Sequence, residues 1–331
     1  MSRLEPLELP GSGPDPANAD WRSWLDERAR GQLRLAGDEI ATLKTAPPGG
    51  GAILQLWNDA GIALGNSFAV VSLLSSVHPD PAVVEQAEAI EVEARSFSTD
   101  LYLDADVFAQ LSSIDAQRLD DGAARMLAKT LRDFRRSGVD RDDEVREQVR
   151  SIDQRLIDLG QAFSRNIRDG RRTTRVPATA LDGLPEDFVA DHRPAEDGSV
   201  AISTEYPDTQ SFLTFAHDPD ARRSVARTFF DLAWPVNDAV LRDLLRLRHE
   251  KATLLGYASW PDYDAEVKMI GRADAIGEFV DRIAGEALDA GRREIGVLTE
   301  RASGDGVDTI DLANWRYYFE AVKREQFGVD A

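Results

Sequence analysis

Hydrophobic residues recur every three or four positions along most of this chain, the spacing that places side chains on one face of an α-helix. The clearest run lies in residues 142–168, where charged and amide side chains take the positions between the apolar ones. The apolar positions of this run are Val145, Val149, Ile152, Leu156, Leu159, Phe163 and Ile167. They predict one amphipathic helix on the order of 40 Å long, at about 1.5 Å per residue.

Residues suited to helix ends precede this run. Gly138 can close the preceding helix, because glycine adopts left-handed backbone conformations without steric cost. Asp140 is the predicted N-cap, and Asp142, Asp143 and Glu144 place negative charge at the positive end of the helix dipole. We therefore interpret this acidic cluster as helix capping. A calcium loop is the weaker alternative, since its glycine and terminal glutamate are not at the required spacing.

Similar patterns predict further helices along the chain. They cover residues 21–44, 52–76, 82–112, 115–137, 219–230, 238–255, 273–300 and 313–327. The helical period fades between residues 171 and 215, where residues 173–178 and 200–205 have the composition of short strands near an Asp-Gly turn. The sequence thus predicts a mainly α protein with a small β element near residues 171–206.

Composition predicts four segments and a soluble protein. The segments are a flexible leader (1–17), an N-terminal helical region (18–170), a mixed strand and loop insertion (171–217) and a second helical region (218–331). The leader lacks the charged and then apolar pattern of a signal peptide. Polar residues interrupt the apolar stretch 53–77 before it reaches the roughly 18 apolar residues of a membrane span. We therefore expect a cytoplasmic protein without a membrane partner.

Charge and cysteine content exclude several function classes. The net charge of −20 repels phosphate backbones and anionic lipids, so we expect no nucleic acid partner. The chain has no cysteine, which excludes disulfides, thiolate zinc sites and a cysteine nucleophile. Any metal would have to be held by His, Asp or Glu side chains. The same absence fits a reducing compartment.

One dipeptide raises the possibility of a zinc site. A zinc peptidase helix carries two histidines four residues apart and a glutamate beside the first, which activates the metal-bound water. His249 and Glu250 are in this order, but Thr253 occupies the position of the second histidine. The other histidines, His78, His192 and His217, have no companion three or four residues away. The sequence therefore predicts no catalytic, cofactor-binding or metal-binding residue in this chain.

Arg248 falls on the apolar face of the helix predicted for residues 238–255. At 100° per residue it lies inside the arc formed by Leu241, Leu244, Leu245, Ala252 and Leu255. A buried guanidinium needs a carboxylate or carbonyl partner, since an unpaired buried charge is costly. We predict a core ion pair between helices, with an anion contact facing a channel as the alternative.

Three other patterns are weak indications of chemistry. Residues 65–69, Gly-Asn-Ser-Phe-Ala, lack the second glycine of a hydrolase nucleophile turn and are predicted to lie within a helix. The basic run 168–175 is typical of a helix end, and it is only weak support for a phosphate site. Trp315, Tyr317 and Tyr318 have the spacing of core aromatics, although they could also await a partner surface.

Seven strings, in order along the chain, resemble one enzyme family. They are SSVHPDPAVVEQAEAIE (75–91), LRDFRRSGVD (131–140) with FSRNIRD (163–169), LDGLPEDFV (181–189) leading to TEYPDTQSFLTF (204–215), LRLRHEKATLLGYASWPDY (245–263) and NWRYYFEAVKREQFGV (314–329). The chain thereby resembles the thimet oligopeptidase, neurolysin and oligopeptidase A family of zinc peptidases. The resemblance implies a helical lobe and part of the wall of a channel that admits short peptides. Ala313-Asn314 stands where relatives commonly have Trp-Asp, which leaves the subfamily open.

The leading hypothesis is the N-terminal half of a zinc-dependent endopeptidase for short peptides. The chain lacks the His-Glu-x-x-His motif, so we expect it to be inactive alone, with zinc bound only in the full-length family and a C-terminal catalytic half as its missing partner. Such a lobe would expose apolar surface and self-associate; Phe319 and Phe327, near the tyrosine pair, fit this picture. The alternative is a stand-alone helical protein that binds peptides or pairs with a partner without catalysis.

Overall fold

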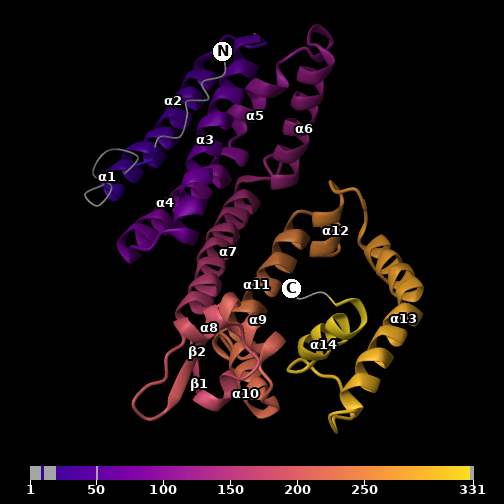
Figure 1. Cartoon of the computed structure of the whole chain (residues 1–331). Helices are drawn as coiled ribbons and strands as arrows, with labels where there is room; N and C mark the ends of the chain where they lie inside the picture. The colour runs from indigo at the N-terminus through magenta and orange to yellow at the C-terminus, as the bar shows by residue number, and fades with distance from the viewer. Residues whose placement is uncertain (1–8, 11–19, 50, 329–331) are drawn as a thin grey trace. The chain divides into compact units, whose positions relative to one another are not determined.

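Helices make up most of the chain in the computed structural model, which describes residues 9–10, 20–49 and 51–328 (Figure 1). Two strands, β1 (Thr173–Pro177) and β2 (Ser199–Ser203), pair antiparallel with Val176 opposite Val200. The predicted mainly α fold with a small β element is therefore confirmed. The predicted leader lies outside the described residues, apart from residues 9 and 10.

The chain forms two compact units, and each is described by itself. The first contains Met1–Gln161 and Arg246–Trp260, and the second contains Ala162–Leu245 and Pro261–Ala331. Two helices, α7 (Asp143–Asp169) and α11 (Val236–Leu254), each contribute residues to both units. These units follow tertiary packing, whereas the four segments predicted above follow composition and remain predictions.

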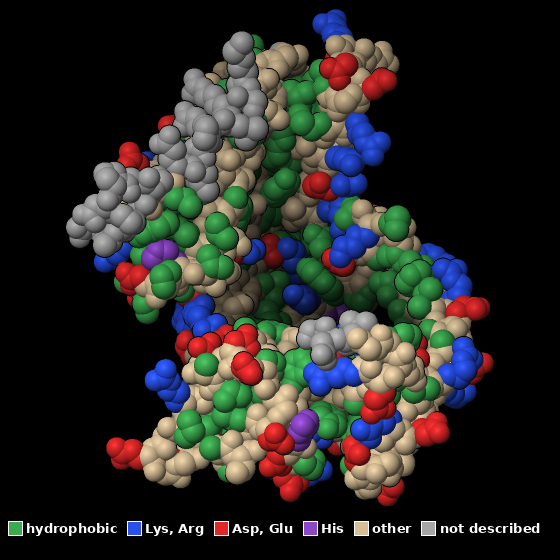
Figure 2. Space-filling view, viewed as in Figure 1, with side chains coloured by type: hydrophobic (Ala, Val, Ile, Leu, Met, Phe, Trp, Pro, Cys, Tyr) green, Lys and Arg blue, Asp and Glu red, His purple; other side chains and the backbone are tan. Residues whose placement is uncertain are grey.

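Charged side chains of both signs cover much of the visible face (Figure 2), as expected of a chain in which 30% of residues are charged. Many of them pair within one helix, such as Arg95 with Glu91 and Arg242 with Asp238. Exposed pairs of this kind contribute only about 0–1 kcal/mol each. The stability of both units therefore depends mainly on the packing of apolar side chains.

The first unit is built from successive antiparallel helices. In chain order these are α1 (Trp21–Leu25), a π-helical turn (Asp26–Arg30), α2 (Gly31–Thr45), α3 (Gly51–Val77), α4 (Pro81–Tyr102), α5 (Ala105–Ser112), a 3₁₀ turn (Ala116–Arg118), α6 (Asp121–Ser137) and the first part of α7. The single helix predicted for residues 82–112 is wrong. The carboxylate of Asp104 accepts hydrogen bonds from the backbone N–H groups of Asp106 and Val107, so a new helix starts there.

The turn between α6 and α7 confirms one predicted cap and corrects another. Gly138 has φ 97° and ends α6, as predicted. The N-cap of α7 is Asp142 and not Asp140, because the Asp142 carboxylate accepts a hydrogen bond of 2.9 Å from the N–H of Val145. Val139 is buried in this turn.

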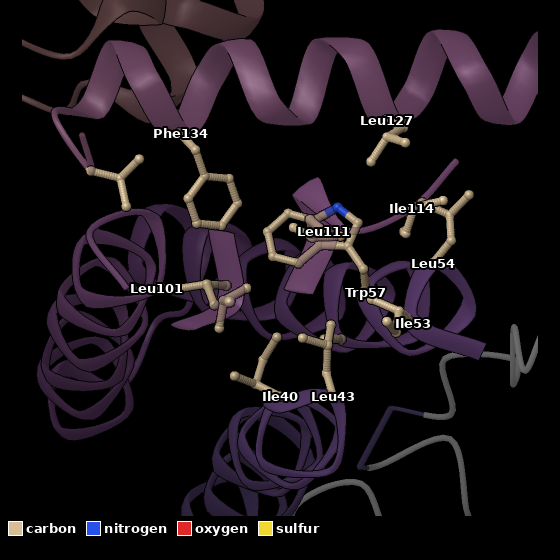
Figure 3. Packing of buried hydrophobic residues seen from close by; sticks show 13 residues of the cluster. Ile40, Leu43, Ile53, Leu54, Trp57, Leu101, Leu111, Ile114, Leu127 and Phe134 are labelled. Atoms are coloured by element: carbon tan, nitrogen blue, oxygen red, sulfur yellow. The ribbon is translucent and has the colours of Figure 1, made fainter. Parts of the chain in front are cut away.

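Aromatic rings form the centre of the larger core cluster in the first unit (Figure 3). The Phe134 ring of α6 lies 5.4 Å from Trp57 of α3, 5.0 Å from Tyr102 of α4 and 5.9 Å from Phe108 of α5, measured between centroids. Phe134 itself has no exposed surface. One side chain therefore joins four helices.

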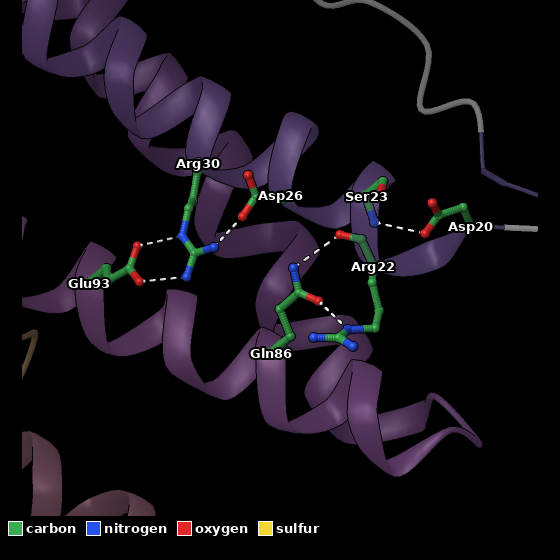
Figure 4. A network of polar contacts seen from close by, with 7 residues as sticks. All are labelled: Asp20, Arg22, Ser23, Asp26, Arg30, Gln86 and Glu93. Carbon is green, nitrogen blue, oxygen red and sulfur yellow. Dashed lines mark hydrogen bonds and ion pairs between the residues drawn. The ribbon is translucent and has the colours of Figure 1, made fainter.

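Polar contacts fix the first helical run against α4 (Figure 4). The guanidinium of Arg30 binds the carboxylate of Glu93 through two nitrogens, at 2.7 and 2.8 Å, and also pairs with Asp26. Near its start, Arg22 and Gln86 exchange two hydrogen bonds of 3.1 and 3.0 Å. These contacts fix the register of residues 22–30 against α4.

Among the described helices, α3 alone is long and apolar enough to cross a membrane by length and composition. Buried core helices pass the same test. In this structure, 39% of the most apolar stretch of α3 is buried, and Ile53, Val71 and Leu74 belong to the core clusters of the first unit. Part of α3 therefore packs into the core of the first unit.

The second unit surrounds the β hairpin with short helices and ends in two longer ones. Besides the strands and parts of α7 and α11, it contains a 3₁₀ turn (Ala178–Leu181), α8 (Glu186–Asp191), α9 (Tyr206–Phe215), α10 (Pro219–Phe230), most of α12 (Trp260–Ala265), α13 (Ala273–Ser303) and α14 (Trp315–Phe327). Its core joins Val200 and Ile202 of β2 to Phe212 of α9 and Val225 of α10.

A pair of asparagines locks α7 to α11 within the second unit. The Asn166 amide nitrogen donates to the side-chain oxygen of Asn237 at 2.8 Å, and Asn237 donates to the carbonyl of Phe163 at 3.0 Å. Asn237 is only 8% exposed, so these hydrogen bonds satisfy a buried amide. Asn166 and Phe163 belong to the FSRNIRD string. Two residues of this string therefore have a structural role, the contact between α7 and α11.

Candidate functional site

The His249-Glu250 dipeptide does not form a metal site. His249 is exposed on α11, and its backbone carbonyl accepts a hydrogen bond of 3.0 Å from the Thr253 hydroxyl. Glu250 pairs with Arg246, one turn earlier on the same helix. Across the described residues, no three His, Asp or Glu side chains gather where they could hold a metal ion. A zinc ion, which the family resemblance implies, does not fit the residues present here.

The buried ion pair predicted for Arg248 is wrong. Arg248 is exposed, and its guanidinium carbon lies 5.6 Å from the centroid of the Trp260 ring. The predicted arc failed because two of its members are not buried: Leu241 is 43% exposed and Leu245 is 55% exposed. The buried face of α11 is therefore not the face that carries Leu241, Leu245 and Arg248.

Lys251 carries the core ion pair instead. Its ammonium nitrogen lies 2.5 and 2.7 Å from the two carboxylate oxygens of Asp153 on α7, and both side chains are largely buried in the first unit. Leu247 and Leu255, four residues before and after Lys251, are also buried. This spacing of four was visible in the sequence, and it was the signal that could have identified Lys251.

Two of the remaining histidines pack against aromatic rings. The His78 ring lies 4.7 Å from the Trp21 ring, between centroids. The His192 ring stacks on Phe188 at 3.9 Å, and its Nε2 lies 3.3 Å from a carboxylate oxygen of Asp208. His78 thus meets an indole ring and His192 a single carboxylate, and among the described residues neither belongs to a group of three side chains that could hold a metal ion.

The serine within residues 65–69 and the basic run 168–175 are also structural. Ser67 is fully buried in the middle of α3, so its hydroxyl cannot reach a substrate. In the basic run, Arg171 pairs with Glu205 at 2.7 Å, and Arg175 donates to the Ser199 hydroxyl at 2.9 Å. These arginines connect the two strands of the hairpin and its flanks.

Two of the family-like strings contribute side chains to one cluster in the second unit. A carboxylate oxygen of Asp182 lies 2.9 Å from Nδ1 of His217, and the His217 ring lies 6.2 Å from the Tyr317 ring, edge to face. The guanidinium of Arg222 covers the other side of Tyr317, with its central carbon 4.0 Å from the ring centroid. Asp182 precedes α8, His217 links α9 to α10, and Tyr317 lies on α14. We call these four side chains the Arg222 cluster.

Arg222 is the most constrained charge in this cluster. It is 2% exposed, and one terminal nitrogen donates to the carbonyls of Ala216 and His217 at 2.5 and 3.1 Å. Burial lowers the pKa of its guanidinium. Sequence reasoning missed this residue, although Ala221, Val225 and Ala226 place it on an apolar helix face in the same way that was argued for Arg248.

Gly183 allows the chain segments of the cluster to approach each other. Its φ of +91° is in the left-handed region that favours glycine. A Cβ at this position would lie 2.4 Å from the carbonyl oxygen of Phe215 and 2.6 Å from the His217 ring. The neighbouring Asp182 carbonyl accepts a hydrogen bond of 2.9 Å from the N–H of His217. The glycine of the LDGLPEDFV string is thus required by geometry.

The aromatic residues of the last string separate into core and surface. Tyr318 is 1% exposed and packs with Leu298 and Ala302 of α13, and burial raises the pKa of its hydroxyl. Phe319 is 55% exposed and Phe327 is 71% exposed. The core interpretation therefore holds for Tyr318, and the interpretation of these aromatics as a partner surface remains a prediction.

The Arg222 cluster holds helices of the second unit together. Hydrogen bonding to Asp182 can orient the His217 imidazole, but within the described part of the chain no hydroxyl group is hydrogen-bonded to that ring. The buried guanidinium of Arg222 is taken up by backbone carbonyls and the Tyr317 face. The cluster therefore positions α9, α10 and α14 relative to one another.

Comparisons with known proteins support the family resemblance that the strings indicated. Residues 212–331 match the sequence profile of peptidase family M3. Saccharolysin of Saccharomyces cerevisiae is 23% identical over 286 residues, covering 81% of this chain and 40% of that protein. Oligopeptidase A of Salmonella typhimurium is 25% identical over 300 residues, covering 82% of this chain and 43% of that protein.

The thimet-like oligopeptidase of Dictyostelium discoideum is 26% identical over 222 residues, which cover 64% of this chain and 33% of that protein. The chain thus spans between 33% and 43% of the length of these relatives. The profile match, the three oligopeptidases and the ordered strings together show that this chain is similar to proteins of peptidase family M3.

Proposed function

We propose that this chain forms a non-catalytic helical part of a zinc-dependent M3 oligopeptidase that cleaves short peptides. The observation that carries the proposal is position 253, where the His249-Glu250 pair is followed by threonine and not by the histidine that a zinc-binding helix requires; the Thr253 hydroxyl donates to the His249 carbonyl. The matches to oligopeptidases over about 80% of the chain support the family role. The chain then contributes a lobe and channel wall, and metal and catalytic groups come from other sequence.

The location that we propose is the cytoplasm. The chain contains no cysteine, which suits a reducing compartment because such compartments do not maintain disulfides. The short peptides that an oligopeptidase would take are also compatible with this location. Fractionation of cells that express the chain, followed by immunoblotting, measures its distribution directly.

An assay with an internally quenched peptide tests the proposed function. We expect no turnover by the purified chain, with or without added zinc, because the groups that would activate a metal-bound water are not brought together. Full-length oligopeptidase A of Salmonella typhimurium, a relative of this chain, is the positive control. Hydrolysis that a chelator abolishes and zinc restores, and that His249→Ala removes, would contradict the proposal.

One observation favours the second candidate, a helical protein that pairs with a partner or binds peptides without catalysis. Apolar side chains on α13 are exposed over most of its length, and Figure 2 shows hydrophobic side chains gathered over its N-terminal part. They include Ile276, Phe279, Val280, Ile283, Leu288 and Ile295, each between 39% and 55% exposed. Calorimetry that detects tight peptide binding without zinc would favour this candidate over the first.

The exposed face of α13 predicts self-association of the purified chain. Contiguous apolar surface of this extent is uncommon on monomeric proteins. We expect light scattering coupled to gel filtration to show a mass that rises with concentration, and Phe279→Glu with Ile283→Glu to restore the monomer. Arg292→Gln with Arg293→Gln makes the same change of net charge elsewhere on the helix and is the matched control. A chain that stays monomeric at every concentration would refute this prediction.

A further inference from the structure

The backbone of β1 presents a row of hydrogen-bonding groups on the side away from β2. In an antiparallel pair, the N–H and C=O groups of successive residues point alternately toward the partner strand and away from it. The N–H of Thr204 donates to the Arg172 carbonyl at 2.9 Å, and the N–H of Ala178 donates to the Gly198 carbonyl at 3.1 Å. These bonds fix the alternation, so the odd-numbered residues of β1 face outward. The outward residues are Thr173, Arg175 and Pro177.

These outward groups are not used within the described part of the chain. Thr173, Arg175 and Pro177 are exposed, and no described residue forms a hydrogen bond with their backbone. Helix α10 packs under the other face of the strand, where the hydroxyls of Thr174 and Thr228 are hydrogen-bonded at 2.8 Å. Because proline has no N–H, the edge offers the N–H groups of two residues and the carbonyls of all three.

The outer edge of β2 is different, because the chain itself occupies it. The N–H and carbonyl groups of Ser199 are hydrogen-bonded to the preceding turn, at 2.9 and 2.8 Å. Those of Ser203 are hydrogen-bonded to side chains of α9, both at 3.1 Å. Only Ala201, between these two serines, has outward groups without a partner among the described residues. The hairpin can therefore accept a further strand along β1 and not along β2.

An exposed cation lies at one end of the open edge. Arg172 directly precedes β1, and its guanidinium makes no ion pair or hydrogen bond with any described residue. The neighbouring Arg171 is paired with Glu205 at 2.7 Å. A C-terminal carboxylate beside Arg172 would gain a charge-assisted contact, whereas an N-terminal ammonium group would be repelled. Charge thus favours a partner strand that ends at Arg172, which is the antiparallel orientation.

We propose that the open edge of β1 binds a short peptide as an added antiparallel strand, with the peptide C-terminus at Arg172. In such strand addition, main-chain hydrogen bonds supply affinity and place little demand on the side chains of the peptide. The edge matches about five peptide residues. Peptide residues 1, 3 and 5 would face β1 and make about five hydrogen bonds with it, while residues 2 and 4 would face away.

Like charges disfavour a second copy of this chain as the occupant. The register that pairs the whole edge of β1 with itself places Arg175 directly opposite Arg175 of the other copy, on the same face. A peptide with uncharged side chains meets no such repulsion. The choice of a short peptide as the natural ligand rests on the proposed function, but binding at this edge requires no hydrolysis.

Fluorescence anisotropy with the full chain and the peptide Thr-Val-Thr-Val-Thr, labelled at its N-terminus and free at its C-terminus, tests the proposal. We expect saturable binding. N-methylation of peptide residues 3 and 5 removes two N–H groups that face β1, and it is expected to weaken binding about tenfold or more. N-methylation of residues 2 and 4 is the matched control and is expected to preserve binding, because those N–H groups face away.

Arg175→Pro makes the corresponding change in the protein. It removes an outward N–H but none of the bonds between β1 and β2, and proline is tolerated where the N–H of a strand faces solvent. We expect binding about tenfold weaker than for Arg175→Gln, which removes the charge alone. Ala201→Pro, directly opposite in the hairpin, is the matched control on the β2 edge and is expected to bind as the unchanged chain does. Circular dichroism monitors the fold, and the N-methylated peptides decide the question if a proline variant unfolds.

Arg172→Gln tests the orientation. It is expected to weaken binding of the free-acid peptide about threefold and to leave binding of the C-terminal amide unchanged. Absence of saturable binding, equal weakening by the two N-methylated peptides, or weakening by Ala201→Pro alone overturns the proposal. Loss of self-association in Arg175→Pro also overturns it, in favour of a second copy at this edge. The two proposals fail separately, since hydrolysis of the peptide refutes the proposed function and absence of binding refutes the role of β1.

Discussion

Gly183→Ala is expected to lower the free energy of unfolding of the second unit by about 3 kcal/mol. Two costs add at this position. The φ of +91° is unfavourable for alanine, and the new methyl group would lie 2.4 Å from the Phe215 carbonyl oxygen and 2.6 Å from the His217 ring. Both obstacles belong to rigid groups, so neither can move aside cheaply. Urea unfolding followed by circular dichroism and tryptophan fluorescence measures the loss.

Gly198→Ala separates the two costs. Gly198 also has positive φ, +74°, but a Cβ there would meet open space. We expect this control to lose only about 1 kcal/mol, the cost of the left-handed conformation alone. Equal losses in the two variants would mean that the close approach of the Arg222 cluster contributes nothing to stability.

Phe134→Ala is expected to destabilise the first unit by about 3–5 kcal/mol, the range measured for removal of large buried aromatics. The ring is fully buried and contacts Trp57, Tyr102 and Phe108, so its loss leaves a cavity among four helices. Denaturant unfolding monitored through tryptophan fluorescence measures the effect, because Trp57 adjoins the cavity.

Phe327→Ala is the matched control for this substitution. The Phe327 side chain is 71% exposed at the end of α14, so we expect its removal to change stability by less than about 0.5 kcal/mol. A loss at Phe134 as small as this would show that the aromatic contacts of the first unit are loosely packed and carry little of its stability.

Helical periodicity predicted most elements but not their breaks. The run of apolar positions in residues 142–168 corresponds closely to α7, although only Val149 and Ile152 of this stripe are buried. The break between α4 and α5 escaped notice, since apolar spacing continues across it and a single cap, Asp104, stops the helix. Local hydrogen bonds of this kind leave little trace in a hydrophobic pattern.

The Arg222 cluster could be recognised only in pieces. The strings that contain Asp182, Phe215 and Tyr317 were each identified in the sequence, but nothing in their spacing indicated that they touch. The contact between the His217 and Tyr317 rings joins residues 100 positions apart. Such contacts follow from the path of the chain and not from local propensity.

The sequence by itself determined the helical class, the place of the hairpin, the resemblance to M3 oligopeptidases and the threonine at position 253, which are properties of residue order. Only the tertiary structure decided which cation is buried. A helical stripe gives the direction of an apolar face, but neighbouring helices decide how much of it they cover. On α11 this coverage buried Lys251 against Asp153 and left Arg248 at the surface.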